Sequence, residues 1–263
     1  MPLDGAASCG VGRALRDGTP GLNTLLLVVL ACFFCLLLLP LKVAMLTVHH
    51  LNNSRSQRVL WMLEELGVPY EIQRYERDRK TMLAPPELRK VHPLGKSPVV
   101  TDGDATLAES GAILEYLVDR YGEGRYSPAP GTPEHLRYRY WMHYAEGSLM
   151  PPLLLKLVFD KVEKAPLIVR PVAKAISATV KRTFITPNLT QHLNLLEGEL
   201  KASPWFAGDR FSAADVQMSF PVEAAAARAG LDTSRPRLME WLKRVHGRPA
   251  YQRAIDKGGP FAL

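Results

Sequence analysis

The stretch LTVHHLNNSRSQRVLWMLEELGVPYEIQRY, residues 46–75, switches from one hydrophobic period to another and back. Residues 46–51 are a short run of strand-forming residues, and residues 69–75 alternate in polarity as a strand does. Residues 55–66 carry apolar side chains on one helix face, at Val59, Met62, Leu63 and Leu66. Gly67 is a typical helix end. The stretch predicts a β-α-β unit whose first loop offers hydroxyl groups but no cysteine.

The next residues continue this alternation of strands and helices. A short helix is predicted over residues 85–91, and a hairpin joins strands at 99–101 and 105–107. A further helix spans residues 110–121, with its apolar stripe at Leu114, Leu117, Val118 and Tyr121. The complete order, β-α-β-α-β-β-α, predicts a small α/β domain.

The second part of the chain is predicted to be helical. Residues 123–133 are rich in Gly and Pro and indicate a linker. One helix beyond it places four leucines on one face, at Leu189, Leu193, Leu196 and Leu200. In the motif FSAADV, Ser212 and Asp215 are spaced as a capping box, to which we assign no catalytic role. We expect an α/β domain over residues 45–122 and an all-helical domain over residues 134–263.

The first 44 residues form an apolar leader. No charged residue occurs between Asp17 and Lys42, and residues 22–39 reach the length of about 18 residues expected of a transmembrane helix candidate. A strand is predicted to start at Leu46, so a membrane helix would lead almost directly into the domain. Met45 stands just before that strand. Two interpretations stay open: a membrane anchor at residues 22–39, or an upstream start added to a cytoplasmic protein that begins at Met45.

Composition and charge exclude several classes of protein. Of the 263 residues, 47% are apolar and 22% are charged, an ordinary globular composition. Cys9, Cys32 and Cys35 all lie in the leader, so the body predicts no disulfide framework, no metal site built on cysteine and no thiol nucleophile. The net charge of +7 suggests anionic partners. We interpret the basic segment 161–182 as solvated surface rather than a nucleic-acid site, because no aromatic residues are interleaved to stack on bases.

The motif KSPVV, residues 96–100, suggests a ligand site. Pro98 directly precedes a predicted strand, where proline is unusual because it cannot donate to a ladder. A cis bond between Ser97 and Pro98 in a tight turn explains this position. It would leave the peptide groups of Val99 free to pair with an extended ligand. An ordinary trans proline at a strand start is the alternative.

The motif LAESGAIL, residues 107–114, suggests the other half of such a site. Glu109 and Ser110 stand at the start of a predicted helix. Ser110 could simply cap that helix. The same N-terminus could instead bind a carboxylate while Glu109 accepts an ammonium group, so the pair would hold an amino-acid headgroup.

Taken together, these features resemble the glutathione S-transferase family. The resemblance rests on the element order, on the motifs SRSQRVLW, GKSPVV, AESGAIL and FSAADV, and on the helical second part. It runs from about Met45 to the C-terminus, and HHLNNSRSQRVLW is most similar to bacterial and fungal members that use serine. The resemblance implies a thioredoxin-like glutathione-binding domain, an all-α domain that shapes the electrophile pocket, and a homodimer.

The resemblance places the activating hydroxyl at Ser54, in the pattern Ser-x-x-x-Arg completed by Arg58. Glutathione brings its own thiol, whose free pKa is about 8.5, and only the thiolate attacks. A hydroxyl can donate O–H···S⁻ and favour the charged form, and the following helix end adds positive potential. Ser56 is the alternative donor or a helix cap, and Arg55 either adds charge or faces solvent. The missing cysteine argues against thiol-transfer members.

Other positions are implied to hold the rest of glutathione. They are Pro98 as the cis-proline after Ser97, Val99 as the backbone clamp, Glu109 and Ser110 at the γ-glutamyl end, and Lys96 and His92 at the glycyl carboxylate.

The electrophile pocket is expected at the aromatic-rich residues 137–150. Tyr138, Trp141 and Tyr144 could line an apolar cleft, or pack between domains or subunits. The expected activity is thiolate attack on small apolar electrophiles or on peroxides. The alternative function is a non-catalytic binding or scaffold protein.

Overall fold

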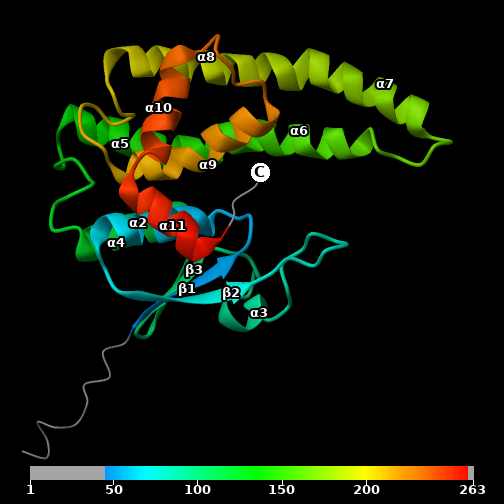
Figure 1. The fold of residues 1–263 in the computed structure, drawn as a ribbon. Coiled ribbons are helices and arrows are strands. Elements are labelled where there is room, and N and C mark those ends of the chain that lie inside the picture. Colours follow the sequence, from blue (N-terminus) through cyan, green and yellow to red (C-terminus); the bar gives the residue numbers. More distant parts are fainter. Residues whose placement is uncertain (1–44, 260–263) are drawn as a thin grey trace, which may run out of the picture. The chain divides into compact units, whose positions relative to one another are not determined.

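The computed structural model describes residues 45–259, so the predicted leader lies outside the described residues. A mixed sheet with its helices comes first, and a larger set of helices follows (Figure 1). The elements of the first part are β1 (Leu46–Leu51), α2 (Ser56–Leu66), β2 (Tyr70–Tyr75), α3 (Leu88–Val91), β3 (Val99–Asp102), β4 (Ala105–Ala108) and α4 (Ser110–Tyr121). This confirms the predicted β-α-β-α-β-β-α order.

The sheet has the strand order β2-β1-β3-β4. β1 and β2 are parallel, which requires the crossover that α2 supplies, and β3 is antiparallel to both β1 and β4. In this register Val48 lies opposite Ile72 on one side and Val100 on the other. The strand ends that carry the KSPVV motif and the β1–α2 loop therefore lie side by side.

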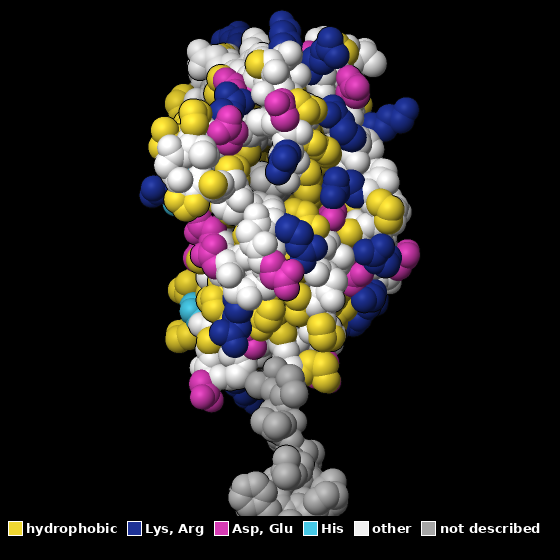
Figure 2. Space-filling view, turned by 90° about the vertical axis from the view of Figure 1, so that its left-hand side faces the viewer, with side chains coloured by type: hydrophobic (Ala, Val, Ile, Leu, Met, Phe, Trp, Pro, Cys, Tyr) yellow, Lys and Arg dark blue, Asp and Glu magenta, His cyan; other side chains and the backbone are white. Residues whose placement is uncertain are grey.

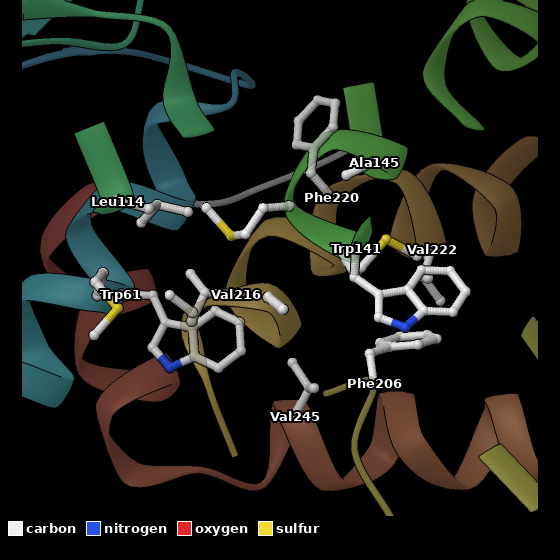
Figure 3. Close-up of a cluster of buried hydrophobic side chains, with 14 of the residues drawn as sticks. Trp61, Leu114, Trp141, Ala145, Phe206, Val216, Phe220, Val222 and Val245 are labelled. Atoms are coloured by element: carbon white, nitrogen blue, oxygen red, sulfur yellow. The ribbon is translucent and has the colours of Figure 1, made fainter. Parts of the chain in front are cut away.

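Helix α2 is buried on all sides rather than on one face. The predicted stripe is buried, but Leu60 and Trp61 are also fully buried. α2 contacts the sheet through β1 and contacts α4, α9 and α11 on its other sides. Figure 3 shows Trp61 beside Val216 of α9, in a hydrophobic cluster that continues to Trp141 and Phe206. Gly67 ends α2 in the left-handed conformation, as predicted.

The second part is helical, as predicted. Its helices are α5 (Pro133–Tyr144), η1 (Ala145–Leu149), α6 (Met150–Val162), α7 (Arg170–Val180), η2 (Lys181–Ile185), α8 (Thr186–Ala202), α9 (Ala213–Arg228), α10 (Pro236–His246) and α11 (Pro249–Gly258). η1 and η2 are single π-helical turns inside longer helices, a feature often found at functional sites. The four leucines of α8 are all buried. Within residues 45–259, the helices are all too short or too polar to cross a bilayer.

The predicted capping box at the start of α9 is confirmed. The buried Asp215 carboxylate accepts the Ser212 peptide N–H at 3.1 Å, the Phe206 peptide N–H at 3.0 Å and the Trp241 indole N–H at 3.1 Å. Burial raises the pKa of Asp215 to about 6, although these donors favour the charged form. One carboxylate therefore joins the start of α9 to α10 and to the preceding loop.

The C-terminal helix α11 packs back onto α2. Glu64 forms ion pairs with Arg253 at 2.8 Å and with Lys257 at 2.5 Å. Near its end the backbone approaches so closely that a Cβ added to Gly258 would lie 2.6 Å from Gln57 Oε1. The last described helix is thus tied to the element that follows the candidate site.

Candidate functional site

The β1–α2 loop turns sharply before the helix begins. Asn53 takes a positive φ of 47°, which asparagine tolerates better than most residues. Arg77 fixes the turn, because its peptide N–H donates to Asn52 Oδ1 at 2.9 Å and its Nε donates to the Asn52 carbonyl at 3.2 Å. The loop thereby places Ser54 just before the N-terminus of α2.

Ser54 belongs to a chain of buried hydrogen bonds. Its Oγ lies 2.7 Å from Ser56 Oγ, which lies 2.8 Å from His50 Nδ1. His50 Nε2 lies 3.0 Å from the Gly258 carbonyl. A carbonyl only accepts, so Nε2 carries the proton and the neutral ring accepts at Nδ1. Ser56 therefore donates to His50, and Ser54 donates to Ser56.

The surroundings of His50 keep its ring neutral. Burial lowers the pKa of His50, and the nearby charge of Arg74 lowers it further, against the opposing effect of the Gly258 carbonyl. A neutral ring is the form that accepts the Ser56 proton. The lowered pKa of His50 therefore favours the chain of donors from Ser54 to Gly258.

Ser56 does not cap α2, so that alternative is wrong. It is the first residue of the helix, and the N-cap position is Arg55, whose side chain makes no capping bond. The Ser56 hydroxyl lies near His50, Ser54 and, at 3.3 Å, the Leu51 carbonyl. Ser56 is fully buried, whereas Ser54 is 4% exposed and accepts the Ser56 peptide N–H at 3.2 Å.

An ion cluster missed by the sequence analysis lies beside this loop. Glu146, on the π-helical turn η1, pairs with Arg55 at 2.9 Å and with Arg58 at 2.5 Å. Arg55 therefore does not simply face solvent. Both guanidinium groups also lie over the Phe220 ring, at 5.1 and 5.3 Å from its centroid. Two positive groups share one carboxylate, so the cluster has a net charge of +1.

Arg58 is the buried centre of that cluster. Its Nη2 donates to Ser110 Oγ at 2.8 Å and its Nη1 donates to the Gln217 carbonyl at 2.5 Å. Burial would raise the pKa of Glu146, but the charges of Arg58 and Arg55 outweigh it and the pKa is lowered. Arg58 thus joins the start of α2, the start of α4 and helix α9.

The Ser97–Pro98 bond is cis, as predicted. The Ser97 hydroxyl donates to the His49 carbonyl at 2.8 Å and accepts the Leu51 peptide N–H at 3.2 Å, so its side chain fixes the end of β1. The expectation that the Val99 peptide groups are free is wrong. Val99 pairs with His49 on one side and with Ala108 on the other, because β3 is an interior strand. Within the described residues, it is the Ser97 peptide N–H and C=O that make no main-chain hydrogen bond.

Glu109 and Ser110 occupy the β4–α4 junction. Glu109 is exposed and has a positive φ of 69°, an uncommon conformation for a residue other than glycine. It is the N-cap residue of α4, and its side chain makes no capping bond. Ser110 does not cap the helix; it is buried, and its hydroxyl accepts from Arg58. Glu109 thus presents an exposed carboxylate next to the buried cluster.

Lys96 and His92 lie in the turn that leads to the cis bond. Lys96 is exposed, and His92 is half-buried at the end of α3. The His92 carbonyl accepts the Gly95 peptide N–H at 2.9 Å, which closes a turn between the two residues. Both side chains come from the segment that precedes Ser97.

The three aromatic residues of α5 pack inside the helical part. Tyr138 and Trp141 are 3% and 2% exposed, and Figure 3 shows Trp141 above Phe206 with its ring inside the cluster. Tyr144 is 6% exposed, and its hydroxyl contacts His192 Nδ1. The structure therefore places Tyr138 and Trp141 in the core rather than along an open cleft.

One cavity of about 790 Å³ lies between the linker and the loop before α9. It is lined by residues 124–129 and 207–212, and none of the site residues predicted from sequence contributes to its wall. Within residues 45–259 there is no group of three or more His, Cys, Asp or Glu side chains placed to hold a metal ion. Of the predicted residues, Ser54 and Ser56 lie at the N-terminus of α2, and Glu109 and Ser110 lie at the N-terminus of α4.

The described residues form a thioredoxin-like sheet joined to an all-helical part. Polar groups lie at two helix N-termini, and a cis-proline turn lies beside them. This combination defines a glutathione transferase fold. Family models agree: "Glutathione S-transferase, N-terminal domain" matches residues 44–119, and "Glutathione S-transferase, C-terminal domain" matches residues 179–244. The chain belongs to the glutathione S-transferase family.

Individual relatives cover most of the chain. It is 39% identical over 214 residues to glutathione S-transferase 3 of Schizosaccharomyces pombe, an alignment that covers 81% of this chain and 88% of the relative. It is 30% identical over 227 residues to glutathione S-transferase 1 of Saccharomyces cerevisiae, with 82% and 97% covered.

Solved structures show the same fold. A glutathione S-transferase from Actinobacillus pleuropneumoniae superposes with a TM-score of 0.69 at 33% identity, covering 81% of this chain and 93% of that one. A theta class enzyme from Xanthomonas axonopodis pv. citri, solved with glutathione bound, gives a TM-score of 0.63 at 26% identity, with 81% and 97% covered.

Proposed function

We propose that this protein is a glutathione transferase in which the Ser54 hydroxyl stabilises the glutathione thiolate. The observation that carries the proposal is the position of Ser54, just before the N-terminus of α2 and bonded to Ser56 at 2.7 Å. Ser56 donates its single proton to His50 at 2.8 Å, so Ser54 is the better donor to a ligand. Its single proton can turn from Ser56 Oγ toward a bound sulfur.

The energies required are modest. Lowering a thiol pKa by about two units takes about 2.7 kcal/mol of preferential stabilisation of the thiolate. A hydrogen bond to a charged acceptor contributes about 1.5–3 kcal/mol, and a helix N-terminus contributes about 0.3–1 kcal/mol. These two contributions are enough without a general base. The net +1 charge of the Arg55–Arg58–Glu146 cluster acts in the same direction.

The remaining predicted residues suit the rest of glutathione. The exposed Glu109 carboxylate can accept the ammonium group of the γ-glutamyl end, and the N-terminus of α4 can bind its carboxylate. The unpaired peptide groups of Ser97 can pair with the cysteinyl backbone, the role that sequence gave to Val99. Lys96 and His92 lie before Ser97 and can reach the glycyl carboxylate.

The reaction then needs only the thiolate and an electrophile. The sulfur attacks the electrophilic atom and a thioether bond forms. In a substitution the leaving group departs with its bonding electron pair, and in an addition the adduct takes up a proton. With a peroxide, the sulfur attacks one oxygen, the O–O bond breaks and an alcohol or water is released. A second glutathione then displaces water from the oxidised sulfur, so the peroxide is reduced and two glutathiones are oxidised to the disulfide. A small apolar electrophile would approach from the helical side, where Glu146 and Phe220 face the Ser54 loop. The tyrosine and tryptophan residues of α5 then support this wall from within the core.

The test compares the wild-type chain with Ser54→Ala and with a matched control, Ser219→Ala. Ser219 is a buried serine of α9 whose hydroxyl donates only to the Val216 carbonyl at 2.9 Å. Glutathione binding is measured by calorimetry, and thiolate formation by ultraviolet absorbance across pH. The proposal is supported if all three chains bind glutathione and if the pKa of the bound thiol is raised only in Ser54→Ala. Absence of glutathione binding at millimolar concentration would instead favour a scaffold.

A further inference from the structure

Helices α6 and α7 form a long hairpin that projects from the helical part. They lie side by side, and the loop that joins them extends past the other helices in Figure 1. We call residues 163–169 of this loop the hairpin tip. The two helices are held together by hydrogen bonds from the Ser177 hydroxyl, which donates to the Phe159 carbonyl at 3.1 Å and to Glu163 at 3.0 Å. The tip is therefore carried on two helices that these hydrogen bonds hold together.

The hairpin tip exposes an unusual run of apolar side chains. Leu167, Ile168 and Val169 are consecutive and are 77%, 94% and 51% exposed. Val172 and Ile176 continue the run along α7, with 64% and 54% exposed. Single exposed apolar residues are normal on a soluble protein, but a contiguous exposed group indicates an interaction surface.

Positive charge surrounds this apolar group. Lys161 and Lys164 precede the apolar residues, and Arg170 and Lys174 follow them. Among residues 45–259, no acidic side chain forms an ion pair with any of these four. Long basic side chains beside an apolar surface can keep their charged ends in a polar layer while their stems lie on the apolar surface.

The acidic groups of the hairpin are already neutralised. Asp160 pairs with Lys156 at 2.9 Å, and Glu163 pairs with Lys181 at 2.9 Å. Hydrogen bonds from Lys181 and Ser177 lower the pKa of Glu163, so it stays ionised within its pair. The tip therefore presents uncompensated positive charge, unlike the face in Figure 2, where side chains of both signs are intermixed.

We propose that the hairpin tip docks on an anionic phospholipid surface. Exposed apolar side chains flanked by lysine and arginine are the combination that binds the membrane interface, where the apolar groups enter the headgroup region and the cations meet anionic lipids. A second copy of this chain is a poorer occupant, because it carries a net charge of +7 and offers no excess negative charge to the tip. This docking is peripheral. It does not depend on residues 22–39, the apolar segment that the sequence analysis considered as a membrane anchor.

The test uses the full chain and vesicles of phosphatidylcholine with or without phosphatidylserine. Binding is measured by co-sedimentation for the wild type, Ile168→Asp and a matched control, Leu83→Asp. Leu83 is also an exposed loop leucine, at 67%, but its loop carries both signs of charge, including Asp78 and Lys80. We expect Ile168→Asp to weaken binding to anionic vesicles about tenfold or more, because it removes the most exposed apolar side chain of the tip. Leu83→Asp, which changes the charge equally, should bind as the wild type does.

A fluorescent probe at the hairpin tip shows whether the tip itself, rather than another part of the chain, contacts the membrane. A Leu167→Trp chain, compared with the wild type, should show a blue shift of the added emission with anionic vesicles and little shift with neutral ones. Equal vesicle binding by Ile168→Asp and the wild type would overturn the proposal, and so would an unshifted emission from Trp at position 167. A change in sedimentation coefficient caused by Ile168→Asp without lipid would also overturn it, because the tip would then contact protein.

Discussion

Ser54 and Ser56 share a buried hydrogen bond of 2.7 Å between their hydroxyl oxygens. Because His50 accepts the Ser56 proton at 2.8 Å, the Ser56 oxygen is left to accept from Ser54. This arrangement distinguishes the two serines. In the function we propose, Ser54 is the donor to the ligand, and Ser56 is a positioning residue that fixes where Ser54 points.

The first prediction separates these roles. Ser56→Ala should raise the pKa of the bound glutathione thiol, but by less than half of the rise in Ser54→Ala, because the donor is kept and only its orientation is loosened. The pKa is read from thiolate absorbance across pH. A larger rise in Ser56→Ala than in Ser54→Ala would reverse the assignment.

The second prediction concerns the sign of the charge beside the thiolate. Arg55→Met removes a positive group and should raise the thiol pKa, whereas Glu146→Gln removes the negative group and should lower it. Each shift is expected to be about 0.5–1 unit, as for a partly exposed charge pair. Shifts in the same direction for both variants would show that the cluster acts through structure rather than through charge.

The same cluster predicts a large effect on stability. Glu146→Gln leaves the buried Arg58 guanidinium without its counter-ion and should lower the free energy of unfolding by about 3–5 kcal/mol. Arg58→Met combined with Glu146→Gln should be less destabilised than the sum of the two single variants. Urea unfolding of the four chains measures this coupling, and strict additivity would contradict it.

Much of this could be predicted from sequence, and the limits have a physical cause. The elements of the first part follow local patterns, such as the helical stripe ended by Gly67 and the capping box at Ser212. Glu146 and His50 were missed because their partners are 88 residues away at Arg58 and 208 residues away at Gly258. The signal available in the sequence was an acidic residue, Glu146, within the aromatic-rich residues 137–150.

The wrong assignment of the backbone clamp to Val99 has the same cause, because it also depends on contacts between distant parts of the chain. Sequence showed that Val99 begins a strand, but only the strand order shows that β3 has neighbours on both sides. The free peptide groups are instead two residues earlier, at Ser97. In the same way, the aromatic residues of α5 have the composition of a pocket wall, and only packing shows that Trp141 lies in the core.

The fourth prediction is a pH dependence of stability. The pKa of Asp215 is about 6 in the folded protein, above its value of 3.8 when unfolded. The group therefore contributes stability that is fully present below about pH 4 and is lost as the pH rises through about 6. This loss is about 3 kcal/mol for a shift of about two units. The Asp215→Asn variant should lack this pH-dependent contribution. The difference in free energy of unfolding between the wild type and the variant should therefore shrink from pH 4 to pH 7. A constant difference would contradict the prediction.

The fifth prediction tests the close packing of α11 on α2. An added Cβ at Gly258 would lie 2.6 Å from Gln57 Oε1 and 2.8 Å from Leu60 Cδ1. Gly258→Ala should therefore destabilise the fold by about 1–3 kcal/mol. The matched control is Gly198→Ala in α8, where a Cβ meets no atom within 4 Å and should stabilise the helix by about 0.5–1 kcal/mol. Thermal unfolding distinguishes the two signs.

The central claim is that Ser54 donates to the glutathione thiolate, and the pKa of the bound thiol in the wild type and Ser54→Ala tests it most directly. We predict a bound thiol pKa near 6.5 in the wild type, about two units below the free value, and a rise of about one to two units in Ser54→Ala with glutathione still bound. An unchanged pKa in Ser54→Ala, with binding retained, would contradict the account.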